Sequence, residues 1–194
     1  MPHHHHDHHF DPQRFRAFED ARRSILPPER ILADLSLDPA AVLADIGAGT
    51  GFLSLPAANV LPQGRVLAVD RQQDMLDMIE ERAREQGLTN IETIQADAAA
   101  LPLADGSVHA VLMSNVFHDI DAQDDMLSEV RRILRPGGTY YLVEWDTIKT
   151  SMGPPLEIRI APEDLSSRLT DAGFTVDQVV REPEPFYRLI ARRP

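Results

Sequence analysis

The sequence of 194 residues predicts an α/β fold: a doubly wound, mostly parallel sheet with helices on both faces. Short apolar runs alternate with segments of helical periodicity along most of the chain, as such a sheet requires. A glycine-rich turn at residues 47–51 follows the first apolar run, and acids stand at or near the ends of three runs. Because ligands of these sheets bind beyond the carboxyl ends of the strands, these features predict a binding site there.

The chain is expected to open with helices before the sheet begins. Pro27 and Pro28 interrupt the first helical pattern and are suited to start the next helix. A turn containing Asp38 and Pro39 then leads into the first strand. The expected elements are a helix over 14–23, a helix over 29–35 and a strand over 42–46.

The rest of the chain alternates strands with helices and closes on two strands. The expected elements are helix 51–60, strand 66–69, helix 73–86, strands 91–95 and 108–114, helix 122–134, strand 139–145, helix 162–172, and strands 174–180 and 186–192. The sequence Arg135-Pro136-Gly137-Gly138 is expected to end the helix before it, and Gly173 to stop the last helix.

The glycine turn indicates the kind of ligand. Gly47, Gly49 and Gly51 are spaced Gly-x-Gly-x-Gly, whereas a dinucleotide site has Gly-x-Gly-x-x-Gly. Asp45 precedes the first glycine by two residues, and its carboxylate would repel a pyrophosphate but attract an ammonium or sulfonium group. The turn therefore predicts a site for a cationic nucleoside, although binding of NAD stays open as a minor alternative.

Asp45-Ile46-Gly47-Ala48-Gly49-Thr50-Gly51 resembles motif I of the class I S-adenosylmethionine-dependent methyltransferases. Two later runs extend the resemblance, Val66-Leu67-Ala68-Val69-Asp70 and Ile91-Glu92-Thr93-Ile94-Gln95-Ala96-Asp97. The resemblance implies that Asp70 holds the ribose hydroxyls and that Asp97 contacts the adenine amino group, with the next backbone N–H on the ring. An isolated acid of this kind is usually a solvated turn residue or a helix cap, but the placement of three in order favours a role in binding.

Two further segments resemble the same family, including its quinone-biosynthesis C-methyltransferases: Leu101-Pro102-Leu103-Ala104-Asp105-Gly106-Ser107 and Leu134-Arg135-Pro136-Gly137-Gly138. The start His-x-Phe-Asp-Pro is similar to that of a small uncharacterised subgroup. The resemblance covers about residues 40–192 and implies a Rossmann-like seven-stranded sheet with a C-terminal antiparallel hairpin. We therefore expect one methyltransferase domain over 13–194, preceded by a flexible His-rich segment over 1–12.

The cofactor that the resemblance implies is S-adenosylmethionine, with S-adenosylhomocysteine as its product. Met75 would pack on the adenine, although a methionine at helical spacing also suits the core. Asn115 would help to hold the methionine portion. The expected cofactor residues are Asp45, Gly47, Ala48, Gly49, Gly51, Asp70, Arg71, Met75, Asp97, Ala98 and Asn115.

Methyl transfer from a sulfonium needs alignment in a dry pocket, and a base only where the acceptor loses a proton. His118 follows the fourth expected strand and is the candidate base, with a structural histidine as the alternative. Arg159 lies in a Pro-rich loop that could cover the pocket and hold an anionic acceptor, or it forms a surface ion pair with Glu157 or Glu163. Glu144 and Trp145 end the fifth strand and could line the acceptor side.

The N-terminal segment carries six of the eight histidines of the chain, His3, His4, His5, His6, His8 and His9. Imidazoles this dense can bind nickel, zinc or copper, and the run is either native or an added tag. A sharper hypothesis is that these histidines and Phe10 fold over the cleft and help to form the acceptor site.

Composition narrows the partners. The net charge of −12 argues against nucleic acid or an anionic membrane as the main partner, so a small-molecule acceptor is expected. The absence of cysteine excludes disulfides and chemistry through protein thiols, including arsenite chemistry of that type. No apolar run reaches the roughly 20 residues of a membrane span, and a cytoplasmic protein is expected. The oligomeric state is not encoded in any visible pattern.

The favoured function is methyl transfer to a small molecule by in-line displacement. Two alternatives keep the fold but not the reaction: a protein that binds S-adenosylmethionine without methyl transfer, and a metal-handling protein in which the histidine segment is primary.

Overall fold

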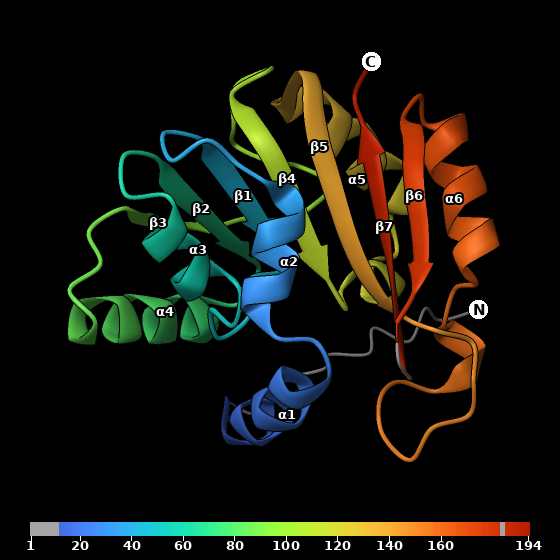
Figure 1. Cartoon of the computed structure of the whole chain (residues 1–194), viewed down its shortest axis with the longest axis horizontal. Coiled ribbons are helices and arrows are strands. Elements are labelled where there is room, and N and C mark those ends of the chain that lie inside the picture. The colour runs from blue at the N-terminus through green and yellow to red at the C-terminus, as the bar shows by residue number, and fades with distance from the viewer. Residues whose placement is uncertain (1–11, 183–184) are drawn as a thin grey trace, which may run out of the picture.

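The computed structural model describes residues 12–182 and 185–194, which include one seven-stranded sheet with the strand order β3-β2-β1-β4-β5-β7-β6 (Figure 1). Side chains are described from Glu19 onward. The strands are β1 (Val42–Ile46), β2 (Arg65–Asp70), β3 (Ile91–Gln95), β4 (Val108–Ser114), β5 (Leu134–Trp145), β6 (Thr175–Arg181) and β7 (Phe186–Arg192).

The direction of the strands confirms the predicted sheet. β1 pairs in parallel with β2 and β4, and the pairs β2–β3 and β4–β5 are parallel as well. β7 is antiparallel to both β5 and β6, so the last two strands form the expected C-terminal hairpin. The carboxyl ends of β1, β2 and β4 therefore meet at one end of the sheet, the lower end in Figure 1.

Helices cover both faces, as their apolar residues require. They are α1 (Pro12–Ile25), α2 (Pro28–Leu35), α3 (Ser54–Val60), α4 (Gln73–Glu85), α5 (Gln123–Ile133) and α6 (Pro162–Asp171), with short 3-10 turns η1 (Phe117–Asp119) and η2 (Leu156–Ile158). α2, α3 and α4 pack on one face of the sheet, whereas α5 and α6 pack on the other. α1 lies across the lower end of the sheet (Figure 1).

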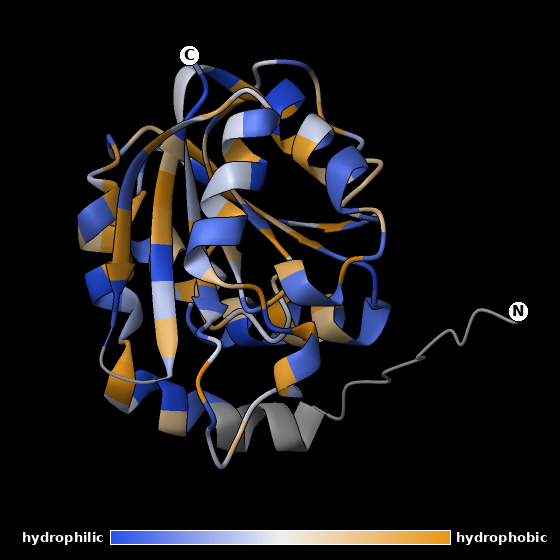
Figure 2. Cartoon of the chain, turned by 90° about the vertical axis from the view of Figure 1, so that its right-hand side faces the viewer, coloured by the Kyte–Doolittle hydropathy of each residue, from blue (hydrophilic) through white to orange (hydrophobic). Residues whose placement is uncertain are grey.

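The core follows the period of two along each strand. On β4, Ala110 and Leu112 join the core beneath α2 and α3, whereas Val111 and Met113 join the core beneath α5 and α6. All four side chains are fully buried. A strand apolar on both faces is what a sheet covered on both sides demands, and Figure 2 shows the resulting hydrophobic bands along the strands.

Several element boundaries differ from those expected. α3 begins at Ser54 rather than 51, because the glycine turn is followed by further turns before the helix starts. β5 begins at Leu134 rather than 139. Leu134 already pairs with Val108, and a register shift beside that pair absorbs the Pro-Gly-Gly residues within the strand. The sequence suggests a turn there, but a bulged strand start accommodates the same residues.

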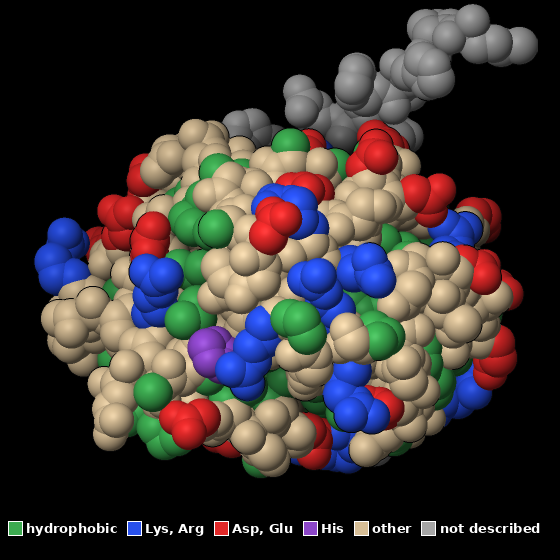
Figure 3. Space-filling view, turned by 90° about the horizontal axis from the view of Figure 1, so that it is seen from above, with side chains coloured by type: hydrophobic (Ala, Val, Ile, Leu, Met, Phe, Trp, Pro, Cys, Tyr) green, Lys and Arg blue, Asp and Glu red, His purple; other side chains and the backbone are tan. Residues whose placement is uncertain are grey.

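The end of the molecule seen in Figure 3, opposite the end that α1 covers, carries basic and acidic side chains next to one another. None of the described helices is long and apolar enough to cross a membrane.

Candidate active site

A cavity of about 710 Å³ lies at the carboxyl ends of β1, β2 and β4. It gathers residues that are far apart in the sequence, from the glycine turn to the loop before η2. Of the sequence-predicted site residues, those that line it are Asp45, Gly47, Ala48, Gly49, Asp70, Arg71, Met75, Asp97, Ala98, Asn115 and His118. Gly51 and Arg159 are not among the lining residues.

The glycine turn packs tightly against the end of β4. The backbone N–H groups of Gly47 and Ala48 both donate to the carbonyl of Val69, at 2.8 and 3.0 Å. Gly47 has a φ of +70°, and a Cβ atom on it would lie 2.4 Å from a methyl of Val116. Glycine is therefore needed there for conformation and for space. Gly51 has a φ of +84° and helps to turn the chain toward α3.

Asp70, at the end of β2, holds the glycine turn from the other side. One carboxylate oxygen accepts the N–H of Gly49 at 2.9 Å, and the other accepts the N–H of Gln72 at 3.0 Å. Both bonds use backbone donors, so the carboxylate is fixed at the cavity wall. Asp97 is exposed and accepts the N–H of Ala99 at 2.8 Å, which makes it a turn residue as well as a lining residue.

Asp45 places a buried acid beneath the turn. Its side chain is 3% exposed and accepts a hydrogen bond from the Ser54 hydroxyl at 2.5 Å. Burial raises the pKa of Asp45 to about 6, against the opposing effects of Ser54 and of the Arg22 guanidinium. Met75 lies in α4, lines the cavity and is 1% exposed, so the same side chain serves the core and the cavity wall.

Arg22 is a cavity residue that the sequence did not reveal. It reaches the cavity from α1, donates to the Ser114 hydroxyl and places its guanidinium carbon 4.4 Å from the centre of the Phe52 ring. Burial lowers the pKa of Arg22 to about 10, although Asp45, Glu19 and Glu144 oppose the effect. Its buried Nε has no hydrogen-bond partner within residues 12–182 and 185–194.

The side-chain amide of Asn115 also lacks hydrogen-bond partners among the described residues. Its φ is +58°, which is unusual for a residue other than glycine. Both the nitrogen and the oxygen of its side-chain amide are buried without a hydrogen-bond partner in the described residues. Buried polar atoms without partners are costly in a folded protein, so the arginine and the amide together indicate a polar ligand at this point of the cavity.

A three-way contact attaches α1 to the glycine turn. The Glu19 carboxylate lies 3.4 Å from Nη1 of Arg82 on α4 and accepts a hydrogen bond from the Thr50 hydroxyl. The same Arg82 nitrogen donates to the Thr50 carbonyl at 2.6 Å. Helix α1 is thereby tied over the cavity, and Arg22 is held in it. No pattern in the sequence connects residues 19, 50 and 82.

His118, in η1, forms a buried pair with Glu144 at the end of β5. The His118 Nδ1 lies 2.7 Å from Oε2 of Glu144, and the two side chains are 5% and 2% exposed. Burial alone would lower the pKa of His118, but the hydrogen bond to Glu144 and its charge outweigh burial, and the pKa is raised. Glu144 is itself fixed by the N–H groups of Phe117 and Trp145, at 2.8 and 3.2 Å. With Nδ1 donating to the carboxylate, Nε2 is the other ring nitrogen; it lies 3.5 Å from Oδ2 of Asp119, whose charge also raises the pKa, and it can act as a base once it is deprotonated.

Arg159 differs from both sequence expectations. Its Nε and Nη groups donate to the carbonyls of Pro154, Asp146, Ile148 and Met152 and to the hydroxyl of Thr150. The guanidinium is 5.0 Å from the Trp145 ring, and the residue is 9% exposed. Glu163 instead pairs with Arg181. Arg159 organises the loop rather than lining the cavity, because the carbonyls of residues 146–154 surround it.

The loop that Arg159 organises forms one wall of the cavity. Gly153 has a φ of +94°, and a Cβ atom on it would lie 2.6 Å from the Trp145 ring, so the backbone itself rests on the indole. Trp145, Gly153, Pro154, Pro155 and Ile158 all line the cavity. The sequence expectation that the Pro-rich loop covers the pocket agrees with this placement.

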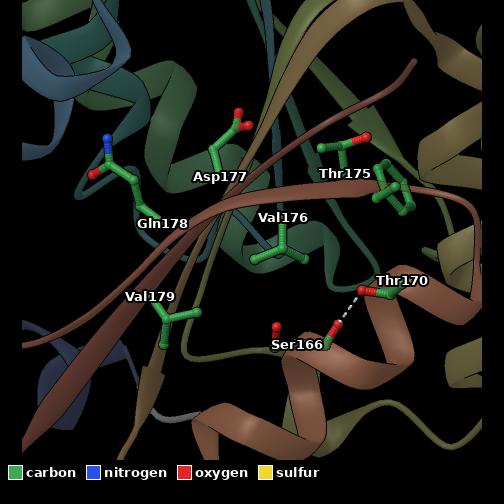
Figure 4. Close-up of a pocket in the computed structure, with 8 residues that line it drawn as sticks. Ser166, Thr170, Thr175, Val176, Asp177, Gln178 and Val179 are labelled. Atoms are coloured by element: carbon green, nitrogen blue, oxygen red, sulfur yellow. Dashed lines mark hydrogen bonds between the residues drawn. The ribbon is translucent and has the colours of Figure 1, made fainter.

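A second hollow lies between α6 and the edge strand β6 (Figure 4). Thr170 donates to the Ser166 carbonyl there at 2.9 Å, and Asp177 is engaged by both Nε and Nη2 of Arg192. Thr170 and Asp177 thus have partners within the protein, whereas the cavity at the strand ends has buried polar atoms without partners among the described residues. We therefore place the functional site at the strand ends.

The histidines at positions 3–6, 8 and 9, and Phe10, lie outside the described residues. Within the described residues no group of three or more His, Asp or Glu side chains could hold a metal ion. Metal binding and the acceptor-site hypothesis for the N-terminal segment both stay predictions.

Residues 43–138 match the family model described as a methyltransferase domain. The chain is 37% identical over 100 residues (52% of this chain and 36% of the relative) to the malonyl-acyl-carrier protein O-methyltransferase of Methylococcus capsulatus. It is 36% identical over 121 residues (61% of this chain and 47% of the relative) to a ubiquinone/menaquinone biosynthesis C-methyltransferase of Acidiphilium cryptum.

Among solved structures, a SAM-dependent methyltransferase from Aquifex aeolicus matches with a TM-score of 0.88 and 26% identity, over 95% of this chain and 100% of that one. By contrast, this chain spans about half or less of the length of the curated relatives that it matches.

Proposed function

This chain belongs to the class I S-adenosylmethionine-dependent methyltransferases, and from that premise we propose that it transfers a methyl group from S-adenosylmethionine to a small-molecule acceptor. The observation that carries the proposal is a cavity that brings together a glycine turn fixed by Asp70, the buried carboxylate of Asp45, and buried side-chain nitrogens of Arg22 and Asn115 that have no hydrogen-bond partner among the described residues.

The residues present fit the amino-acid end of this cofactor. Its carboxylate needs donors, and Arg22 and Asn115 offer N–H groups that no described residue uses. Its ammonium group needs an acceptor and a negative charge, which Asp45 supplies from beneath the turn. Gly47 and Gly49 line the cavity from the same part of the chain as Asp45, and glycine at 47 lets the turn pack against Val116.

The nucleoside end fits the next two strands. Asp70 would hold the ribose hydroxyls, and Asp97 and the backbone of Ala98 would contact the adenine. Met75 and Arg71 stand at the same part of the wall. These assignments are supported by the family resemblance and by the common cavity, and they stay proposals.

When bound, S-adenosylmethionine would supply an electrophilic methyl group to the nucleophile of the acceptor, with its sulfonium sulfur as the leaving group. The protein's tasks are to align the acceptor, exclude water and take up a proton where one is lost. His118 is the group for the last task, because Glu144 fixes its ring and stabilises its protonated form.

The acceptor is left open by the comparisons. One relative is named for O-methylation of a malonyl group and another for C-methylation in quinone biosynthesis. Because the chain covers 36% and 47% of those two relatives, neither substrate can be carried over directly. A cytoplasmic location likewise stays a prediction from the sequence.

Two measurements on one sample test the proposal. Titration with S-adenosylhomocysteine and with NAD should show binding of the first only. Incubation with labelled S-adenosylmethionine and a panel of quinols, phenols, thiols and amines should then transfer label to an acceptor. Binding without transfer to any acceptor would favour a binding protein of the same fold, and metal binding with no cofactor binding would favour the metal-handling alternative.

A further inference from the structure

The lining residues that the proposed function does not assign to the cofactor, which we call the acceptor half, include an apolar group and an acidic group. Trp145, Pro154, Pro155 and Ile158 form the apolar group. Trp145 is 3% exposed, whereas Ile158 and its neighbour Leu156 are 41% and 40% exposed at the rim. A large aliphatic side chain exposed at the rim of a cavity is suited to contact an apolar ligand.

The acidic group follows His118 in the sequence. Asp119 and Asp121 line the cavity together with Ile120, and Oδ2 of Asp119 lies 3.5 Å from Nε2 of His118. The basic residues that line the cavity, Arg22 and Arg71, stand with the residues assigned to the cofactor. Among the described residues, the acceptor half therefore has carboxylates at its wall and no lysine or arginine.

The positive charge of Arg159 lies close enough to His118 to lower its pKa, so Arg159 could also attract an anionic acceptor. A guanidinium has five N–H bonds, and the five hydrogen bonds of Arg159 go to four loop carbonyls and one hydroxyl. No N–H is left for a ligand unless the loop comes apart. Arg22 is the other buried cation nearby, and the cofactor carboxylate takes it under the proposed function.

We propose that the acceptor is an aromatic compound that is uncharged or cationic and that carries its nucleophile, an O–H or N–H group, next to His118. Carboxylate and phosphate compounds are rejected, because the acceptor half would leave their charge unpaired next to Asp119 and Asp121. The inference rests on the proposed function and narrows it. In the reaction, the acceptor's O or N forms the bond to the methyl carbon, sulfur keeps the electrons of the broken bond, and the acceptor's proton goes to His118 Nε2.

Three catechols that differ in one substituent test the inference: ethyl, aminoethyl and carboxymethyl. Their dissociation constants are measured by calorimetry at low salt on protein saturated with S-adenosylhomocysteine. We expect the ethyl and aminoethyl compounds to bind about tenfold more tightly than the carboxymethyl compound, the size of one unfavourable charge contact. Equal or tighter binding of the carboxymethyl compound, or binding of none of the three, would overturn the inference.

A pair of double variants identifies the source of the selectivity. Asp119→Asn with Asp121→Asn should shrink the difference between the aminoethyl and carboxymethyl compounds by about tenfold. Glu85→Gln with Asp171→Asn removes the same charge from the exposed ends of α4 and α6 and should leave the difference unchanged. An equal effect of both double variants would mean that net charge, not the acidic group, sets the preference.

The titration with S-adenosylhomocysteine comes first and keeps the two proposals apart. If the product does not bind, the proposed function fails. If it binds and the catechol series shows the opposite charge preference, only the acceptor class is wrong.

Discussion

The two halves of the cavity are built in different ways. The cofactor half is made by strand ends and the backbone of one turn, with Asp70 accepting two backbone N–H groups and Gly47 packed on Val116. The acceptor half is made by side chains from two loops, with His118 on Glu144 and the Arg159 guanidinium filling the loop above Trp145. A backbone cradle suits a ligand that does not change, whereas side chains on loops can be exchanged to suit another acceptor.

The largest effect is expected in the acceptor half. Glu144→Gln should lower kcat by about 100-fold to 10,000-fold, the usual contribution of a positioned general base, while affinity for S-adenosylhomocysteine stays nearly unchanged. His118→Gln should match it. A variant that lost both kcat and cofactor affinity would show that the pair is structural.

The pH dependence of the methyl-transfer rate tests whether His118 acts as a base or is only structural. Because Glu144 raises the pKa of His118, the wild-type rate should increase as pH rises through that raised value and frees the base. Removing the carboxylate lowers the pKa, so the rising limb of the Glu144→Gln rate should move to lower pH. A limb that does not move would contradict proton uptake by His118.

The next-largest effect is expected at Gly47 in the glycine turn. Gly47→Ala places a Cβ 2.4 Å from a Val116 methyl at a φ of +70°, so it should lower the free energy of unfolding and weaken cofactor binding together. The expected stability loss is about 1–3 kcal/mol, from strain and overpacking. Gly87→Ala is the matched control, since Gly87 has a φ of +67° but nothing within 4 Å of its Cβ position. Denaturant unfolding gives the free energy of unfolding of both variants, and the difference between them is the cost of the contact between the new Cβ at position 47 and Val116.

Asp45 should show opposite effects on stability and binding. Burial raises its pKa from 3.8 to about 6, so above pH 6 the folded protein holds a carboxylate that the unfolded chain ionises more easily. Asp45→Asn should therefore stabilise the protein without ligand at pH 8 by up to about 3 kcal/mol, an advantage that disappears below about pH 4. The same variant should bind S-adenosylmethionine more weakly, and wild-type affinity should fall as pH drops through about 6. Calorimetry and thermal unfolding across pH test both; a destabilised variant at pH 8 would refute the assignment.

The smallest effect concerns the contact that ties down α1. Glu19→Gln weakens the partly buried pair with Arg82 and should reduce cofactor affinity by about threefold to tenfold, because α1 holds Arg22 in the cavity. Asp20→Asn on the exposed side of the same helix is the control and should have no effect. Equal affinities for Glu19→Gln and wild type would mean that α1 does not contribute to the cofactor half.

The same contrast explains how much could be predicted from the sequence. The strands at 42–46, 91–95, 108–114 and 186–192 were predicted to the residue, because apolar period and turn residues are local signals. The cofactor half was accessible for the same reason: Asp45, Gly47 and Asp70 lie in short segments with a recognisable order. The start of β5 was wrong, since a bulge can absorb a Pro-Gly-Gly sequence that usually marks a turn.

The acceptor half could be predicted only in part. His118 and Glu144 were both candidates, but their pairing joins residues that are 26 positions apart through the end of β5. In the cofactor half, Arg22 and the Glu19–Arg82 contact were also missed, because they depend on where α1 packs and no local pattern in the sequence records that. An arginine is a usual ligand for an anion, but the N–H groups of Arg159 all donate to carbonyls and a hydroxyl of its own loop. The sequence does not show how that loop folds.

The central claim is that an acid-held glycine turn binds an adenosyl cofactor, and Asp70 tests it most directly. The account predicts that wild-type protein binds S-adenosylhomocysteine and that Asp70→Ala lowers the affinity about 100-fold, the loss of a charged acceptor from two hydroxyl groups. Unchanged affinity in Asp70→Ala, or no binding by the wild-type protein, would contradict it.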